Sequence, residues 1–398
     1  MNSGDLAWVL VSAALVWVMT PGLALFYGGL GERRNLLHTM FIPVMIIGIA
    51  SLVWFVVGYT LSFGGSGNVI GNFKHLFLTN VSFTHSTKDL TIPDGAFALF
   101  QGMFPIITAA IITGSVIGRV RIKALLVFIA LWLIFIYSPL AHMVWGGGFL
   151  AQLGAIDFAG GTVVHISSGV TGLVLALMIG HRHIDKHIPV RPSYVLIGGA
   201  LLWVGWFGFN SGSALAANGT AVLALVNTWL ASAAAVLTWG LVEYKYHGRA
   251  TLSGITSGGV AGLVAITPAA GFVAPWAAVV MGLLAGFIGF AGITFVKNSF
   301  GYDDTLDAFG IHGIGGAVGA ILTGVFADKS VGGVAGLING NISLVGKQLV
   351  AILFTIAFAA IGTYVLAKIT ELIAAPLRLT ADEEAEGYDA IMQDLTVE

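Results

Sequence analysis

The chain has 398 residues, of which 57% are hydrophobic and only 9% are Asp, Glu, Lys or Arg, and its formal net charge is -2. Soluble domains carry about 25% charged residues, so this chain cannot cover a water-facing surface, and nearly all of it is expected to lie in a lipid bilayer. No basic stripe suggests nucleic acid as a partner, and the absence of cysteine excludes disulfides and thiolate metal sites.

Apolar runs long enough to cross a bilayer recur along the whole chain. A spanning helix needs about 20 apolar residues, and the runs here are continuous, whereas strands of a closed β-barrel would alternate. The first run, MNSGDLAWVLVSAALVWVM, has no basic start and no small-residue cleavage site, so we expect a membrane helix rather than a signal peptide. The sequence predicts eleven helices, at residues 5–30, 38–63, 94–116, 122–144, 157–179, 193–215, 220–242, 252–268, 273–296, 307–327 and 345–374.

The lysines and arginines lie mostly on one side of these helices. If the N-terminus is outside, 13 of the 17 fall in the inner connections and only 4 outside. Inner loops of membrane proteins carry such an excess, so we predict that the N-terminus is outside and the C-terminus inside. The inner set is Arg33, Arg34, Arg119, Arg121, Lys123, Arg182, Lys186, Arg191, Lys245, Arg249, Lys297, Lys368 and Arg378, and the outer set is Lys74, Lys88, Lys329 and Lys347.

The chain is therefore predicted to be an all-α membrane protein with eleven transmembrane helices. The first five helices and the next five enter from opposite sides, which favours an inverted 5+5 repeat followed by a final helix. The fifth helix carries Asp157 and His165, and the tenth carries Asp307 and His312, although any two polar helices resemble each other at this level. Residues 1–375 form the predicted membrane domain, and residues 376–398 form an acidic cytosolic tail that is expected to be regulatory or partly disordered.

Two histidines are predicted to approach each other near the middle of the membrane. His165 lies about 12 Å below the outer end of the fifth helix, and His312 lies about 8 Å above the inner end of the tenth. In a hydrocarbon core of about 30 Å they come within roughly 10 Å of each other. Buried neutral imidazoles offer a donor and an acceptor, so the pair could line a path for a small molecule. The competing interpretation is a structural hydrogen bond between the two halves.

Other polar and aromatic residues gather at the outer ends of the predicted helices. Asp157 is placed to cap the fifth helix, and its carboxylate could also attract cations at a pore mouth. Trp145 ends the fourth helix, and Ser213 lies near the outer end of the sixth, with Phe209 one turn deeper on the same face. An indole face and a hydroxyl oxygen favour a hydrogen-bonding cation over a metal ion, unless Trp145 only anchors the helix at the interface.

Several long segments then point to one family. They are PGLALFYGGLGERRNLLHTM (21–40), FQGMF (100–104), HMVWGGG (142–148), DFAGGTVVHI (157–166), GWFGFNSGS (205–213), GLVAITPAAGFV (262–273) and DAFGIHGIGG (307–316). The sequence resembles the ammonium transporters of the Amt/Mep/Rh family over almost its whole length.

The resemblance implies a homotrimer in the plasma membrane with one pore in each subunit, and no cofactor or resident metal. It implies an outer ammonium site at Trp145, Ser213 and Phe104, with Asp157 behind it. It also implies a gate formed by Phe104 and Phe209, pore histidines at His165 and His312, and a cytosolic face on which a PII-type nitrogen-signalling protein docks.

The expected function is ammonium uptake rather than enzymatic catalysis. A charge at the bilayer centre costs at least about 2.5–3.5 kcal/mol, whereas a neutral amine avoids that cost. Ammonium, unlike potassium, can lose a proton, so we expect it to cross as ammonia. The alternatives are an ammonium sensor that acts through its cytosolic face, a channel for another small neutral gas, and a redox protein that uses His165 and His312 as axial haem ligands.

Overall fold

Ten helical segments in the described part of the chain are long and apolar enough to cross a membrane, and α11 (Leu252–Ile266) is a shorter apolar helix. The computed structural model describes residues 1–183 and 191–393, so Lys186 lies outside the described residues. Each of the eleven predicted segments is helical over most of its length, and the all-α membrane fold is confirmed.

The first half of the chain forms five of these spans. They are α1 (Ser3–Leu30); α2 (Leu36–Val53), which continues through η2 (Trp54–Gly58) into α3 (Tyr59–Phe63); α4 (Asp94–Thr113); α5 (Ile122–Trp132), which continues through η4 (Leu133–Tyr137) into α6 (Ser138–Trp145); and η5 (Gly161–Ile166) with α8 (Ser167–Ile179). The short helix α7 (Phe149–Leu153) precedes the fifth span.

The second half forms the remaining five spans, the shorter apolar helix α11 and the tail. They are α9 (Pro192–Gly212); α10 (Gly219–His247); α11; α12 (Pro275–Ala291), which continues through η6 (Gly292–Val296) into α13 (Lys297–Phe300); η7 (Phe309–Ile314) with α14 (Gly315–Phe326); and α16 (Ile342–Ile373). The short helix α15 (Lys329–Gly332) lies between the last two spans, and α17 (Ala381–Glu386) and α18 (Tyr388–Gln393) form the tail.

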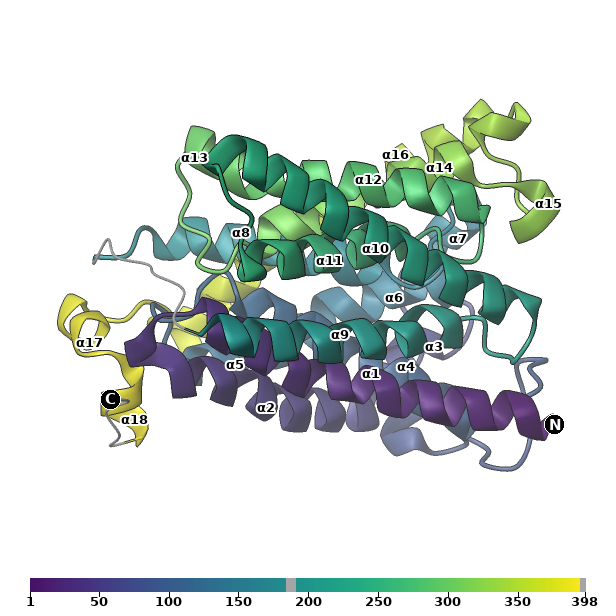
Figure 1. The fold of residues 1–398 in the computed structure, drawn as a ribbon. Helices are drawn as coiled ribbons and strands as arrows, with labels where there is room; N and C mark the ends of the chain where they lie inside the picture. The colour runs from purple at the N-terminus through teal and green to yellow at the C-terminus, as the bar shows by residue number, and fades with distance from the viewer. Residues whose placement is uncertain (184–190, 394–398) are drawn as a thin grey trace.

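The long helices run side by side between two ends of the bundle (Figure 1). The N-terminus lies at one end, which we call the N-terminal end, and α17 and α18 lie at the other, which we call the tail end. Leu241 and Leu372, at 71% and 85% exposure, belong to the apolar side chains on the outer surface of the bundle. Such a surface is stable where lipid surrounds it.

The first helix of each half packs closely against the other, because glycines line the contact between α1 and α9. A Cβ atom on Gly198 would lie 2.7 Å from Phe26 Cα, and one on Gly208 would lie 2.7 Å from Leu15 Cβ. Lipid gives apolar side chains no reason to associate, so helices in membranes gain attraction by close backbone approach at small residues.

Both histidine-bearing spans begin later than the sequence predicts, and both begin with a π-helical segment. The fifth starts at Gly161 rather than residue 157, and the tenth starts at Phe309 rather than residue 307. Asp157 precedes Gly160, whose φ of 126° breaks the helix, and Asp307 itself has a φ of 60°. These two residues with positive φ change the direction of the chain just before the first helical turn of each span. π-helical segments are rare in proteins as a whole, but those that occur are often found at functional sites.

Candidate functional site

The two predicted histidines meet inside the bundle. His165 Nδ1 and His312 Nδ1 are 3.2 Å apart, and the two ring centroids are 5.2 Å apart at an interplanar angle of 27°. Both side chains are buried, at 0% and 4% exposure. One Nδ1 must donate and the other must accept. The predicted approach of the two rings from opposite halves of the chain is therefore confirmed.

Glycines set the spacing of the spans that carry these rings. A Cβ on Gly169, one turn beyond His165, would lie 2.6 Å from Gly313 Cα and still closer to the Gly313 nitrogen. A Cβ on Gly316, one turn beyond His312, would lie 2.9 Å from His165 Cβ. The backbones of α8 and η7 therefore touch beside the imidazole pair, which only glycine permits.

Aromatic side chains hold the His165 ring in place. It stacks on Trp206 with centroids 5.3 Å apart and on Phe209 at 6.1 Å. Trp206 is fixed in turn, because its indole Nε1 donates to Thr267 Oγ1 at 2.8 Å. His165 Nε2 is buried and has no hydrogen-bond partner among the described residues. This nitrogen is therefore available for a further hydrogen bond.

The predicted gate residues are in contact on the side of His165 towards the N-terminal end. The Phe104 and Phe209 rings have centroids 4.5 Å apart at 39°, and Phe104 lies 5.9 Å from Trp145 at 77°. Ser213 joins this group through the backbone, because its hydroxyl donates to the Phe209 carbonyl oxygen at 2.8 Å. The structure therefore brings Trp145, Phe104, Phe209 and Ser213 into one connected set that leads to His165.

Asp157 caps the first turn of the fifth span. Its Oδ1 accepts from the backbone nitrogens of Gly160 and Gly161 at 2.8 and 2.7 Å, and its Oδ2 accepts from the Thr162 nitrogen at 2.7 Å and the Thr162 hydroxyl. A carboxylate has about four acceptor positions, so these bonds leave little room for a direct cation ligand. The Asp157 carbonyl oxygen also accepts from Trp145 Nε1 at 2.8 Å, so Asp157 positions the tryptophan as well.

Beyond the histidines, towards the tail end, lies a small and largely apolar cavity. Leu23, Ile107 and Val260 are among the side chains that line it with His312, and the space for the centre of a water-sized molecule is about 10 Å³. That volume holds about one water or ammonia molecule. The lining also includes Tyr27, whose hydroxyl donates to the Ile111 carbonyl oxygen at 3.1 Å.

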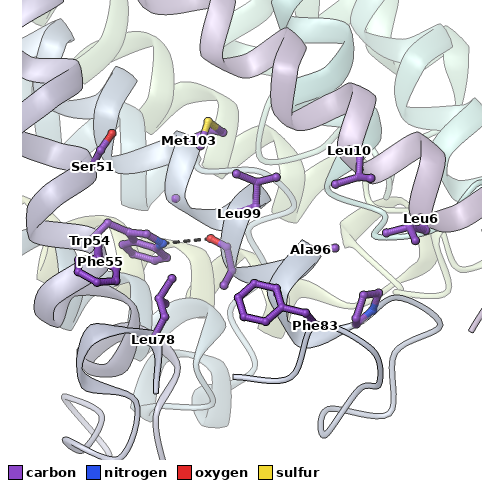
Figure 2. Close-up of a pocket in the computed structure, with 14 residues that line it drawn as sticks. Leu6, Leu10, Ser51, Trp54, Phe55, Leu78, Phe83, Ala96, Leu99 and Met103 are labelled. Atoms are coloured by element: carbon purple, nitrogen blue, oxygen red, sulfur yellow. Dashed lines mark hydrogen bonds between the residues drawn. The ribbon is translucent and has the colours of Figure 1, made fainter. Parts of the chain in front are cut away.

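A larger groove of about 580 Å³ lies on the outer surface of the bundle between α1, η2 and α4 (Figure 2). Apolar side chains such as Leu10, Phe55 and Leu99 form its walls, and the Trp54 indole nitrogen donates to the Ala98 carbonyl oxygen at 3.0 Å. The groove has no Asp or Glu in its lining and does not include the histidines, so it is separate from the candidate pore.

The haem alternative does not fit this geometry. Metal–imidazole bonds are about 2 Å long, so two axial nitrogens stand roughly 4 Å apart with the porphyrin between them. His165 Nδ1 and His312 Nδ1 are in direct contact at 3.2 Å, which leaves no slot for the ring. Within residues 1–183 and 191–393, no group of three or more His, Asp or Glu side chains could hold a metal ion.

Several parts of this site were not predicted from the sequence. They are the stacking of Trp206 on His165, the glycine contacts at Gly169 and Gly313, and the π geometry. The run GGTVVHISSG and the run GIHGIGG place glycines around both histidines at one-turn spacing, and that pattern was the available signal.

The chain is similar to known proteins over almost its whole length. The model of the Ammonium Transporter Family matches residues 7–397. The "Ammonium transporter" of Bacillus subtilis is 49% identical over 395 residues, which cover 98% of both chains. Among solved structures, Mep2 of Candida albicans has a TM-score of 0.89 at 34% identity and covers 96% of this chain and 88% of its own. A structure described as "Sensor Amt Protein" has a TM-score of 0.89 at 27% identity over 98% of each chain.

Proposed function

Because this chain belongs to the ammonium transporter family, we propose that it passes ammonium across the membrane as the uncharged amine, along a hydrophobic pore lined by His165 and His312. The chain is a multi-pass membrane transporter of ammonium and not an enzyme. Potassium has a size and charge similar to those of ammonium, so a pore that admitted both would dissipate the ion gradients of the cell. The mechanism must therefore use a property that potassium lacks.

Binding begins at the N-terminal end of the bundle, which we assign to the outside. The Trp145 indole face attracts the cation, and the Ser213 hydroxyl oxygen accepts a hydrogen bond from it. The Ser213 hydroxyl hydrogen is directed at the Phe209 carbonyl oxygen, so the lone pairs of the hydroxyl oxygen remain for the substrate. The Asp157 carboxylate contributes its negative charge from behind Trp145 while it caps η5.

Ammonium then gives up its proton to solvent water on the outer side of Phe104 and Phe209, and ammonia moves past these rings to the histidines. A cation in this apolar path would pay at least about 2.5–3.5 kcal/mol, which is a factor of roughly 100 in occupancy. The neutral amine can donate a hydrogen bond to one imidazole and accept one from the other. The single observation that carries this proposal is the buried imidazole pair, with its Nδ1 atoms 3.2 Å apart.

The test is to replace both histidines by alanine, His165→Ala with His312→Ala, in the full-length protein reconstituted in lipid vesicles. The fluxes of ammonium and methylammonium, followed by the pH change inside the vesicles, and the flux of potassium are compared with those of the wild type. Selective ammonium transport should be abolished. A matched control replaces two exposed histidines, His85→Ala with His247→Ala, and should behave like the wild type. Unchanged ammonium selectivity in the first variant would reduce the pair to a structural hydrogen bond.

An ammonium sensor is the second candidate, and the likeness to "Sensor Amt Protein" favours it. The chain would then report ammonium through the tail helices α17 and α18. If the histidine variant fails to transport but still triggers the nitrogen response in cells, sensing is the main function. A channel for another small neutral gas would instead conduct that gas in the wild type and show no preference for ammonium.

By likeness to the family we also propose a homotrimer with a pore in each subunit, residues 1–375 forming the membrane domain and residues 376–398 the cytosolic tail. The excess of Lys and Arg in the connections at the tail end supports a cytosolic location for that end. A PII-type regulatory protein would dock there. An inverted repeat is supported by the matching π segments η5 and η7, each of which carries one histidine.

A further inference from the structure

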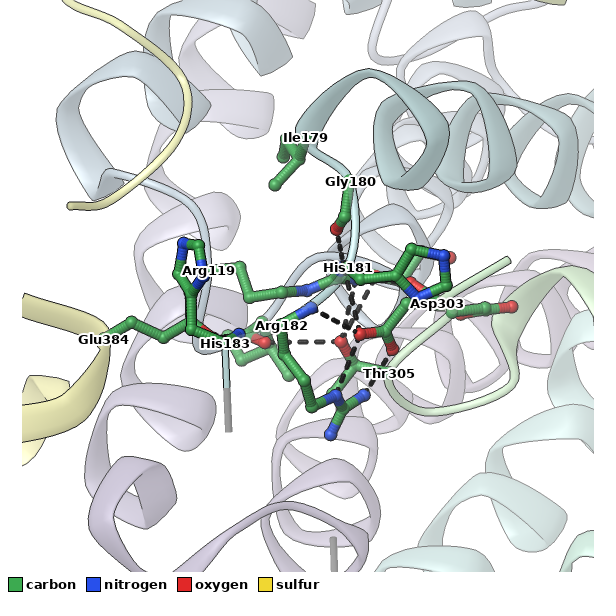
Figure 3. Close-up of polar contacts among 12 residues, drawn as sticks. Arg119, Ile179, Gly180, His181, Arg182, His183, Asp303, Thr305 and Glu384 are labelled. Atoms are coloured by element: carbon green, nitrogen blue, oxygen red, sulfur yellow. Dashed lines mark hydrogen bonds and ion pairs between the residues drawn. The ribbon is translucent and has the colours of Figure 1, made fainter. Parts of the chain in front are cut away.

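We infer that Asp303 is a positioning residue for the proposed pore, because it joins the buried Arg119 to the partly buried Arg182 at the tail-end termini of three segments that line this pore (Figure 3). The segments are α4, which carries Phe104; the span of η5 and α8, which carries His165; and η7, which carries His312. The inference rests on the proposed passage of ammonia along the histidines, since it names the contacts that keep the two imidazole rings at their spacing.

Arg119 is the centre of this cluster. It follows the turn after α4, and its side chain is only 2% exposed. Its guanidinium donates to the Ser115 carbonyl oxygen at 2.7 Å and to Thr305 Oγ1 at 3.2 Å, and it also donates to the carbonyl oxygens of Gly180 and Asp303. One side chain therefore binds the end of α4, the end of α8 and the loop before η7.

Asp303 joins Arg119 to a second arginine. Its carboxylate lies 3.4 Å from Arg119 Nη1 and accepts from Arg182 through a two-pronged contact, with Nε to Oδ2 at 2.9 Å and Nη2 to Oδ1. The Arg182 backbone nitrogen also donates to Oδ2 at 2.9 Å. Paired bonds between a guanidinium and a carboxylate fix orientation as well as distance, so the loops at residues 180–183 and 301–308 are locked together.

The charges of the cluster depend on each other. Burial by itself would raise the pKa of Asp303, but hydrogen bonds from Arg182 and the nearby Arg119 charge hold that pKa well below its ordinary range. Glu32 adds a second negative charge 3.4 Å from Arg182. Removing one partner of a buried ion pair leaves the other charge without compensation. A neutral side chain at residue 303 should therefore make the two arginines move apart or draw in water.

Such a movement of the arginines would shift the histidines, because helical spans connect the cluster to both of them. Gly180 ends the span that carries His165, and Asp303 lies nine residues before His312 in the sequence. The two spans touch through the backbones of Gly169 and Gly313, so a shift at the tail end cannot be absorbed by side chains alone. Misplacement by about 1 Å in a site that depends on geometry can change a rate by about 100-fold.

The functional experiment compares Asp303→Asn, Asp303→Glu and a control in the full-length reconstituted protein. Glu371→Gln is the matched control, because Glu371 also pairs with a basic residue, Lys368, but in an exposed contact. We measure initial ammonium flux and the flux ratio of ammonium to methylammonium. Asp303→Asn should lower the flux by about 10-fold or more and change the ratio, Asp303→Glu should recover part of both, and Glu371→Gln should leave both unchanged.

A distance measurement tests positioning directly. The chain has no cysteine, so Leu177→Cys and Phe300→Cys, at sites 61% and 79% exposed, can carry two spin labels beside the cluster. Labelled protein is diluted with unlabelled protein, and the distance distribution is measured by double electron–electron resonance. Asp303→Asn should shift or broaden the distribution, and Glu371→Gln should not. If Asp303→Asn does not fold, Arg182→Lys keeps the charge, loses the two-pronged contact and should act in the same direction.

An Asp303→Asn protein with the wild-type distance distribution, or with the wild-type flux ratio, would overturn the inference. The distance measurement does not depend on what the pore conducts. A failure of the proposed function would appear instead in the histidine variant, so the two failures can be told apart.

Discussion

Single buried polar side chains position the residues of the proposed pore. Asp157 caps η5 and fixes Trp145 through its carbonyl oxygen, and Thr267 fixes Trp206 under the His165 ring. The sequence predicted the capping role and the meeting of the histidines, because both follow from helix direction and depth. It could not predict that the Asp157 oxygens are fully used, since that depends on the φ of 126° at Gly160.

Gly169→Ala should damage both stability and transport. The added Cβ would overlap the Gly313 backbone, which cannot rotate away, so α8 and η7 must separate at a cost of about 1–3 kcal/mol. We expect a lower thermal unfolding midpoint in detergent and a lower ammonium flux in vesicles. Gly346→Ala in α16 is the control, because a Cβ there meets nothing within 4 Å, and it should stabilise the helix slightly. Equal behaviour of the two variants would contradict the close contact beside the histidines.

Asp303 should also give the protein a specific sensitivity to acid. The pKa of Asp303 in the folded protein lies below its ordinary value of 3.8. The ionised Asp303 therefore contributes its full stabilisation at pH values above 3.8. This contribution is lost as the pH falls towards the lower pKa that Asp303 has in the folded protein. Thermal unfolding midpoints of the wild type should fall below about pH 4 more steeply than those of Asp303→Asn. Parallel curves for the two proteins would show that the carboxylate is not stabilised by its arginines.

At the level of helices, the C-terminal tail is docked rather than loose over its described residues. The Asp389 carboxylate accepts from the backbone nitrogens of Leu37 and His38, both at 2.8 Å, and so caps the start of α2. The Tyr388 ring stacks on the His38 ring with centroids 3.9 Å apart at 2°. The sequence predicted an acidic tail without a span, but these contacts join residues more than 350 positions apart, and no local pattern encodes such a contact.

Asp389→Ala should release the tail. Loss of a helix cap costs about 0.5–2 kcal/mol, and here the cap also anchors α18. Arg378, which now donates to the carbonyl oxygens of Ile179 and His181, should become open to trypsin, and residues 379–398 should be cleaved faster. Asp382→Ala, at an exposed position in α17, should leave the cleavage rate unchanged. A tail that stays protected in the first variant would show that Asp389 is not its anchor.

For the whole molecule, charge and hydropathy determine much of the architecture. All eleven predicted helices are present because each contains a long apolar run, and such runs have few alternatives in lipid. The packing partners could not be predicted, since close approach in lipid depends on where glycines of two distant helices coincide, as at Gly198 in α9 against Phe26 in α1. The π segments could not be predicted either, because the hydropathy pattern of a π-helical segment does not differ from that of an α-helix.

Orientation in the membrane can be checked with single cysteines. Leu337→Cys lies between α15 and α16 at the N-terminal end, and Tyr246→Cys lies near the end of α10 at the tail end, at positions 41% and 56% exposed. With the N-terminus outside, a membrane-impermeant maleimide should label Leu337→Cys in intact cells and label Tyr246→Cys only after permeabilisation. The opposite pattern would reverse the assigned direction of uptake.

The π segments have one further consequence. A π turn holds more residues than an α turn of the same height, so η5 contains a residue that ordinary helix would not need. Deleting one amino acid there would let the span relax to regular α-helix with the flanking turns still in register, and only the side chains within η5, His165 among them, would change direction. The hydropathy profile would barely change and the protein would still insert, yet His165 would face away from its partner. A single codon deletion in this segment would therefore remove the proposed pore and leave the membrane topology intact.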